Sequence, residues 1–182
     1  AKNNNELVNN LGNFVNRALV LTDKYWGGII PAQNELTDMD KSVLSDLESY
    51  PLKISASIEK HRYKEALGLI MKLSDLGNKY LADTEPWKLI KTDEARVETI
   101  MNIALQITAA LAVLAEPFLP ETVKKMKAMM NYDGVIWSSV SISNIEAGHK
   151  INKPSLLFQR IDDDVVETQR AKLKKSKEDA EA

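Results

Sequence analysis

No cysteine occurs among the 182 residues of this chain, so disulfide bonds and thiolate metal sites are excluded. An excess of basic charge is also missing, because 24 Lys and Arg face 26 Asp and Glu and the formal net charge is -2. Bulk, sequence-independent binding of nucleic acid usually needs a basic surface, so this balance argues against it. A small, specific nucleic-acid site stays compatible with the charge.

Targeting signals are missing as well. The opening residues AKNNNELVNN have no signal-peptide pattern. The longest apolar region, residues 103–119, is interrupted by Gln106, Thr108, Glu116 and Pro117, so we expect no membrane-spanning helix and no membrane partner. We therefore expect a cytoplasmic protein. The sequence also begins abruptly, as if within a helix, which suggests a fragment of a longer protein.

Motifs for catalysis or metal binding are weak or missing. His61 and His149 lie on different predicted elements, and neither belongs to the Glu-x-x-His pair that builds metal sites in helix bundles. Gly27 and Gly28 lack the spacing of a phosphate-binding loop. The acidic run 162–164 is better explained by a solvated helix start than by a cation site. An autonomous enzyme has no support, and we expect no catalysis from this chain alone.

What the sequence does contain is helical periodicity. Apolar residues recur every three to four positions, which predicts helices over residues 6–21, 38–59, 63–81, 93–115 and 120–130. Thr37 is the expected N-cap of the second helix, and Pro51 is expected to kink or split it. The fourth helix is apolar on most sides from Ile100 onward, as in the middle of a bundle. The fold class is an all-α bundle of about five helices.

The C-terminal part of the chain has a different character. We predict three parts: a helix bundle over residues 1–132, an irregular, loop-rich segment over 133–168, and a charged helical tail or linker over 169–182. The loop-rich segment has the composition of loops and a short hairpin. Its apolar residues Leu156, Leu157 and Phe158 are expected to pin it against the bundle.

A row of polar side chains is the strongest functional signal. Asn9, Asn13 and Arg17 are spaced four residues apart, so on an α-helix they line one face. Their planar amide and guanidinium groups can donate and accept hydrogen bonds. Trp87, which follows Pro86, offers a flat stacking surface. Together these groups could read an unstacked RNA base by its edge and its face.

Structural explanations compete with this interpretation. Asn is a poor helix former that often caps or binds locally, so for Asn13 the two explanations are evenly matched on the residues alone. Trp87 by itself is better explained as a packing residue, as are Trp26 and Trp137. The position of Trp87 decides the matter, because the polar row needs it nearby to form a site.

Five short motifs, taken in order, resemble a known family. They are LGNFVNR at 11–17, NKY at 78–80, TEPWK at 84–88, EPFLPET at 116–122 and LFQRI at 157–161. The set is similar to the C-terminal half of bacterial-type methionyl-tRNA synthetase, over about residues 1–168. The resemblance implies the helical anticodon-binding domain of a class I aminoacyl-tRNA synthetase, which reads the CAU anticodon of methionine tRNAs.

The resemblance also implies roles for residues that match the family's motifs. Asn13 and Arg17 would contact the edge of the wobble cytosine, and Trp87 would stack on the base. Asn9 lies one turn earlier, and Pro86 would shape the turn that carries Trp87. These five residues are the predicted RNA-binding site.

The parent protein implied by the resemblance is a methionine–tRNA ligase. This chain has no His-x-Gly-His and no Lys-Met-Ser-Lys-Ser motif, which in this family belong to the catalytic domain. ATP would therefore bind to a catalytic domain that is missing here. Whether that domain also holds zinc is left open. The expected partners are methionine tRNA, through its anticodon loop, and that catalytic domain; a homodimeric parent is left open. Two alternatives remain: a helical protein-interaction module, and the anticodon domain of a sister class I synthetase.

Overall fold

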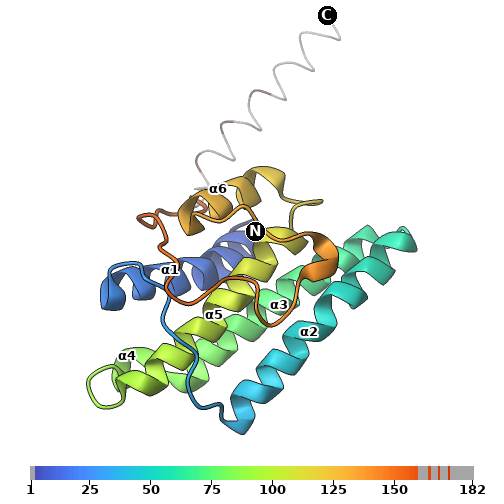
Figure 1. Cartoon of the computed structure of the whole chain (residues 1–182). Helices are drawn as coiled ribbons and strands as arrows, with labels where there is room; N and C mark the ends of the chain where they lie inside the picture. Colours follow the sequence, from blue (N-terminus) through green and yellow to red (C-terminus); the bar gives the residue numbers. More distant parts are fainter. Residues whose placement is uncertain (1–2, 160–163, 165–167, 169–171, 173–182) are drawn as a thin grey trace, which may run out of the picture.

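The computed structural model describes residues 3–159, 164, 168 and 172 (Figure 1). Within them the regular structure is helical, apart from one isolated β-bridge. Five α-helices have eleven residues or more: α1 (Asn13–Trp26), α2 (Asp38–Glu59), α3 (Tyr63–Thr84), α5 (Glu94–Leu114) and α6 (Pro120–Met130). Shorter elements are the π-helix η1 (Asn3–Gly12), α4 (Pro86–Leu89) and the 3-10 helix η2 (Trp137–Ser139). The predicted all-α bundle of about five helices is confirmed.

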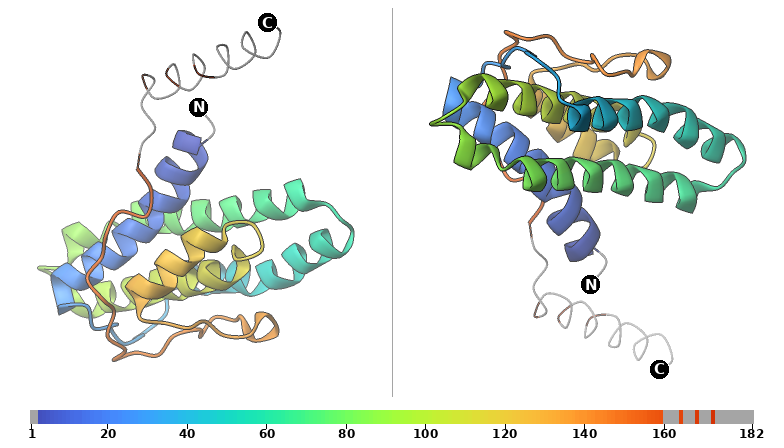
Figure 2. Two further views of the ribbon diagram at one scale, coloured as in Figure 1. Left: turned by 90° about the horizontal axis from the view of Figure 1, so that it is seen from above. Right: turned by 90° about the horizontal axis from the view of Figure 1, so that it is seen from below.

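The central helix of the bundle is α5, which contacts α1, α2, α3, α4 and α6. Figure 2 shows it enclosed between the α2–α3 hairpin and the layer made by α1 and α6. By length and hydropathy α5 would suit a membrane span, so its polar residues alone do not exclude one. Its apolar window, of mean hydropathy 1.7, is 94% buried inside the protein. The apolar character is therefore accounted for by its place in the core, as predicted.

The start of α2 follows the predicted chemistry, whereas its middle does not. Thr37 accepts a hydrogen bond from the backbone N–H of Asp40, and the Asp40 carboxylate accepts one from the Thr37 N–H, which forms a capping box. Pro51 is buried within α2, and the helix continues unbroken to Glu59. The predicted split is wrong, because α2 packs along α3 and this packing offsets the backbone hydrogen bond that proline removes.

The first helix also departs from expectation. Residues 6–21 are helical as predicted, but residues 3–12 form a π-helix, and α1 begins only at Asn13. This stretch is rich in Asn, a weak α-helix former, and it ends at Gly12. At its other end α1 runs past residue 21 to Trp26, where Gly27 takes the left-handed conformation, φ +56°, that closes a helix.

No hairpin forms in the described part of the loop-rich segment. Residues 148–151 pair instead with residues 28–30: the N–H of Ile30 donates to the His149 carbonyl over 2.9 Å, and that of Ile151 donates to the Gly28 carbonyl over 2.9 Å. Leu157 is buried and Phe158 packs against the core, but Leu156 is 72% exposed. Two of the three predicted anchors therefore hold this segment to the bundle.

A buried glutamine anchors the middle of the same segment. The side-chain oxygen of Gln106 on α5 accepts hydrogen bonds from the backbone N–H groups of Asn144 (2.6 Å) and Ile145 (3.1 Å). Trp26 and Trp137 pack against the core, as expected for loop-end residues. Apart from residue 172, the predicted tail over residues 169–182 lies outside the described residues, as do residues 162 and 163 of the acidic run. The division into three parts stays a prediction.

Candidate nucleic-acid interface

Trp87 lies beside the first helix. The guanidinium carbon of Arg17 is 4.9 Å from the centroid of the Trp87 ring, within the range of a cation–π contact. Trp87 keeps 37% of its surface exposed, so the ring is neither a core residue nor fully covered by Arg17. This is the arrangement on which the sequence interpretation depends, and it brings together residues 70 positions apart in the chain.

The turn that carries Trp87 has an unusual backbone. Glu85, with φ +43°, occupies the left-handed region that ends α3, and Pro86 begins α4 in the first-turn position that suits proline. Pro86 is buried, and α4 packs on α5. The Glu85 carboxylate pairs with the Lys88 ammonium over 2.7 Å. The reversal at Glu85 turns the chain back after α3, so that Trp87 faces α1.

Asn13 is tied to α3. Its side-chain N–H donates to the side-chain oxygen of Asn78 over 3.1 Å. Asn78 in turn donates to the backbone carbonyl of Asn10 over 3.1 Å, and the Asn10 side chain donates to the Met71 carbonyl over 3.3 Å. Because Asn13 begins α1, it shares an α-helical face with Arg17 one turn later.

Sequence reasoning missed the participation of Asn10 and Asn78. Asn78 is part of the NKY motif, and Asn10 stands next to the predicted Asn9. The same sequence feature that singles out Asn13 applies to them. An Asn within a helix weakens the helix, so its presence suggests that its side chain has a hydrogen-bond partner.

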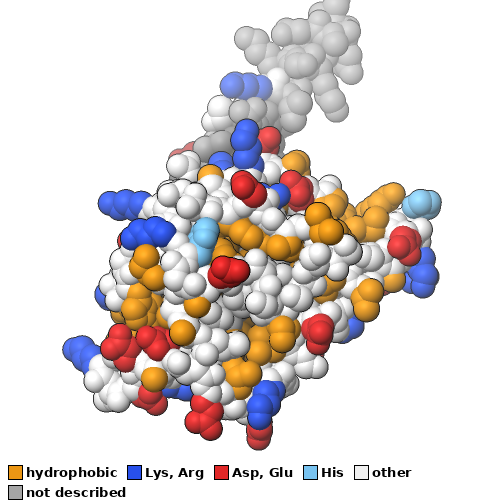
Figure 3. Space-filling model, viewed as in Figure 1, with side chains coloured by type: hydrophobic (Ala, Val, Ile, Leu, Met, Phe, Trp, Pro, Cys, Tyr) orange, Lys and Arg blue, Asp and Glu red, His pale blue; other side chains and the backbone are white. Residues whose placement is uncertain are grey.

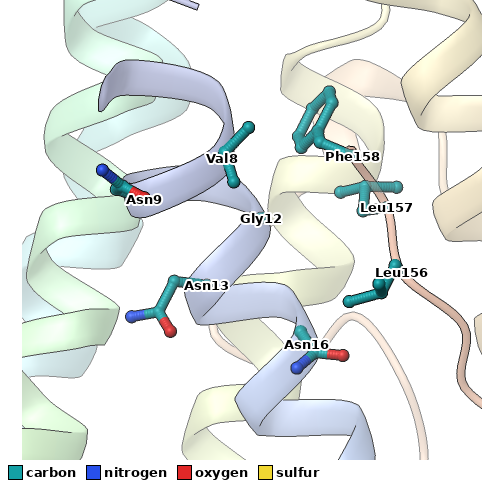
Figure 4. Close-up of a pocket in the computed structure, with 8 residues that line it drawn as sticks. All are labelled: Val8, Asn9, Gly12, Asn13, Asn16, Leu156, Leu157 and Phe158. Atoms are coloured by element: carbon teal, nitrogen blue, oxygen red, sulfur yellow. The ribbon is translucent and has the colours of Figure 1, made fainter. Parts of the chain in front are cut away.

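Asn9 occupies a different neighbourhood. It is exposed and lines a shallow pocket of about 440 Å³ together with Asn13. Figure 4 shows the two amides on one side of the first helix and the 156–158 segment running along its other side. The other residues that line the pocket are Val8, Gly12, Asn16, Leu156, Leu157 and Phe158. The structure thus places Asn9 beside Asn13 and Trp87 beside Arg17, while Pro86 is buried at the start of α4, next to Trp87 in the chain.

An ion pair between the buried Asp40 and the partly buried Arg96 was not predicted from the sequence. The Asp40 carboxylate accepts two hydrogen bonds from Arg96, over 2.6 and 2.8 Å, and one from the Tyr80 hydroxyl over 2.6 Å. Burial raises the pKa of Asp40, but the bonds from Arg96, Tyr80 and Thr37 outweigh it and lower the pKa to about 2. The carboxylate therefore joins α2, α3 and α5 in its charged form.

Tyr80 responds in the opposite direction. Burial and the hydrogen bond to Asp40 raise the pKa of the Tyr80 hydroxyl, which stays protonated and keeps donating. Tyr80 lies two residues after Asn78, so the ion pair holds the part of α3 that bears on Asn13. In the part of the chain that the structure describes, no three His, Cys, Asp or Glu residues are placed to hold a metal ion.

With the site geometry known, comparison with other proteins identifies the family. A family model for the anticodon binding domain of methionyl tRNA ligase matches residues 30–178. The chain belongs to this family. The match includes Pro86 and Trp87 of the site, while Asn9, Asn13 and Arg17 precede it.

Relatives of this anticodon-binding domain family cover the rest of the site. The methionine–tRNA ligase of Parabacteroides distasonis is 50% identical in an alignment of 184 positions that covers 99% of this chain and 27% of that protein. That of Flavobacterium psychrophilum is 48% identical in an alignment of 180 positions that covers 97% of this chain and 26% of that protein. The chain thus spans about a quarter of the length of these curated relatives.

A solved structure matches the fold of the domain. The free form of Mycobacterium tuberculosis methionyl-tRNA synthetase superposes with a TM-score of 0.82, over 88% of this chain and 34% of that one, at 24% sequence identity. At this identity the likeness establishes the fold alone. It confirms the predicted fold type, that of the anticodon-binding bundle of a class I synthetase.

Proposed function

We propose that this domain binds the CAU anticodon of methionine tRNA as part of a methionine–tRNA ligase. The observation that carries the proposal is the position of Arg17, 4.9 Å from the ring of a partly exposed Trp87 and one turn from Asn13 on α1. A stacking surface, a guanidinium and an amide on one side of a bundle are the groups that an unstacked base requires.

The chemistry of these groups fits cytosine. Stacking on Trp87 contributes roughly 1–3 kcal/mol per base, with little preference among bases. Discrimination must then come from hydrogen bonds, because a wrong base leaves buried donors or acceptors unpaired. Arg17 can only donate, which suits the ring nitrogen and the carbonyl of cytosine, whereas Asn13 can accept from its amine. Asn9 extends the polar surface one turn further, and Pro86 holds the turn of Trp87.

Surface charge supports a local site rather than a broad one. The face in Figure 3 carries acidic and basic side chains intermixed, in keeping with the net charge of -2. A protein that bound the tRNA backbone alone would need many basic contacts. Specific contacts to the anticodon suit this surface better, with backbone contacts supplied by other parts of the ligase.

The remaining chemistry of the ligase belongs outside this chain. ATP-dependent charging of tRNA with methionine would take place on a catalytic domain, which would also hold zinc if the ligase uses it. The ligase would work in the cytoplasm. A homodimeric state of the ligase is a further prediction, tested by measuring its mass in solution.

The test separates tRNA recognition from the first chemical step. In the complete ligase, Trp87→Ala and Asn13→Ala should lower kcat/KM for tRNA charging, while methionine-dependent exchange of pyrophosphate into ATP stays near the native rate. Trp87→Phe should lose less, because it keeps an aromatic face. Trp137→Phe is the matched control for that variant, since Trp137 donates its indole N–H to Ser55 on α2.

The alternatives predict different results. A protein-interaction module would charge tRNA normally with Ala at position 87, and an equal loss in both reactions would indicate general damage. A domain reading another anticodon would favour a tRNA other than the CAU form. Membership in the family disfavours both alternatives.

A further inference from the structure

Three side-chain amides link α3 to the candidate site in one chain of hydrogen bonds. We call Asn10, Asn78 and Asn13 the amide relay. It begins at the backbone carbonyl of Met71, which accepts from Asn10, and it ends at Asn13, whose N–H group donates to Asn78. Asn78 is half-buried between the two helices, and Asn13 is exposed at the outer end.

The direction of the relay follows from its two backbone carbonyls, which can only accept. Asn10 must turn its N–H group toward the Met71 carbonyl, 3.3 Å away. Asn78 must turn its N–H group toward the backbone carbonyl of Asn10, at 3.1 Å, and it also lies 3.4 Å from the Asn10 side-chain oxygen. The side-chain oxygen of Asn78 is therefore left to accept from Asn13.

Asn13 cannot reverse its amide without a penalty. A reversed Asn13 would place its oxygen against the oxygen of Asn78. Reversing Asn78 as well would place an oxygen against the Asn10 carbonyl. Each alternative removes a hydrogen bond and adds a repulsive contact between acceptors at a half-buried position. The native orientation therefore points the oxygen of Asn13 away from Asn78.

The orientation has a consequence for base recognition. An outward oxygen accepts from an amino group and repels a carbonyl. Cytosine carries an amino group where uracil carries a carbonyl, so the oxygen of Asn13 would favour cytosine at that position. Arg17 offers only donors, so it cannot supply this acceptor.

We infer that Asn78 is a specificity-determining positioning residue: it orients Asn13 so that the first anticodon base is accepted as cytosine and rejected as uracil. This inference rests on the proposed function. Asn78 touches no base itself and acts through Asn13.

The experiment compares two tRNA transcripts in the complete ligase, with anticodons CAU and UAU. The ratio of their kcat/KM values for charging is the readout, because general damage lowers both values and leaves the ratio unchanged. Asn78→Leu removes the acceptor for Asn13, so the preference for CAU should fall by about tenfold, which corresponds to one hydrogen bond of average strength. Asn78→Ala should act in the same way and serves if the Leu variant does not fold.

Asn78→Asp is the matched control. Asp still accepts from the N–H group of Asn13 but cannot donate to the Asn10 carbonyl. This variant should be less stable and charge both tRNAs more slowly, yet keep a CAU preference near the native value. An unchanged ratio in the folded Leu and Ala variants overturns the inference, as does a fall in the Asp variant as large as in Leu.

Trp87→Ala distinguishes failure of the proposed function from failure of the role inferred for Asn78. If that variant charges the CAU transcript at the native rate, the proposed function fails. If it loses charging while Asn78→Leu keeps the native ratio, the proposed function stands and the role given to Asn78 is wrong.

Discussion

Phe14 occupies the space where a side chain at Gly77 would lie. A Cβ atom placed on Gly77 would stand 2.3 Å from the Phe14 ring, well inside van der Waals contact, and Phe14 is fully buried and cannot swing away. This missing side chain lets α1 approach α3. Asn13, which precedes Phe14, and Asn78, which follows Gly77, then lie within hydrogen-bond distance of each other.

Gly77→Ala should therefore destabilise the protein by about 1–3 kcal/mol, the usual cost of overpacking a core. Denaturant unfolding followed by circular dichroism measures the change. Gly68→Ala is a matched control in the same helix, because nothing lies within 4 Å of its Cβ position. That control should be neutral or stabilising by up to about 1 kcal/mol, through helix propensity. Equal effects at the two positions would contradict the packing argument.

The Asp40–Arg96 pair should make the free energy of unfolding depend on pH in the acidic range. Since the pKa of Asp40 is lowered to about 2 in the folded state, its contribution is present above the ordinary carboxyl pKa near 4 and is lost as pH falls toward 2. We expect a loss of roughly 1–2 kcal/mol over this window, measured by unfolding at successive pH values.

Asp40→Asn provides the comparison for that titration. It leaves the partly buried Arg96 charge without its partner, so we expect about 1–3 kcal/mol of destabilisation at neutral pH. The variant should also have a shallower fall in stability between pH 4 and pH 2. A slope identical to that of the native protein would show that another carboxylate dominates.

Arg17→Lys should impair tRNA charging although it preserves the charge. Lysine cannot reproduce the planar fork of arginine or its flat contact with the Trp87 ring, so kcat/KM should fall about tenfold or more. Arg62→Lys is the control, because Arg62 is exposed beside Glu65 at the start of α3. If Arg17→Lys and Arg62→Lys have the same effect on tRNA charging, Arg17 contributes only its positive charge and the prediction is wrong.

The left-handed backbone at Glu85 should control the orientation of Trp87. Glu85→Val places a β-branched residue at φ +43° and should cost about 1–2 kcal/mol, whereas Glu85→Gly relieves the strain and loses only the exposed pair with Lys88. Fluorescence of Trp87, with Trp26 and Trp137 replaced by Phe, reports its surroundings. The spectrum should change in the Val variant and stay close to native with Gly; the reverse would refute this role.

Local chemistry made much of the fold predictable. Thr37 caps α2 because a hydroxyl next to acidic residues satisfies free N–H groups within one turn. The apolar run in α5 identified the central helix, since only a surrounded helix can be apolar on nearly every side. The π-helix before Asn13 and the unbroken α2 at Pro51 were not predictable, because each depends on packing from neighbouring elements.

The candidate site divides in the same way. The spacing of Asn13 and Arg17 put them on one helical face, and the motif around Trp87 indicated its family, from residues adjacent in the chain. The contact between Arg17 and Trp87, the amide relay through Asn78 and the ion pair of Asp40 each join residues more than 50 positions apart. These contacts depend on how the helices pack, on Gly77, which allows α1 and α3 to approach closely, and on the left-handed turn at Glu85. The spacing of neighbouring residues in the sequence does not predict them.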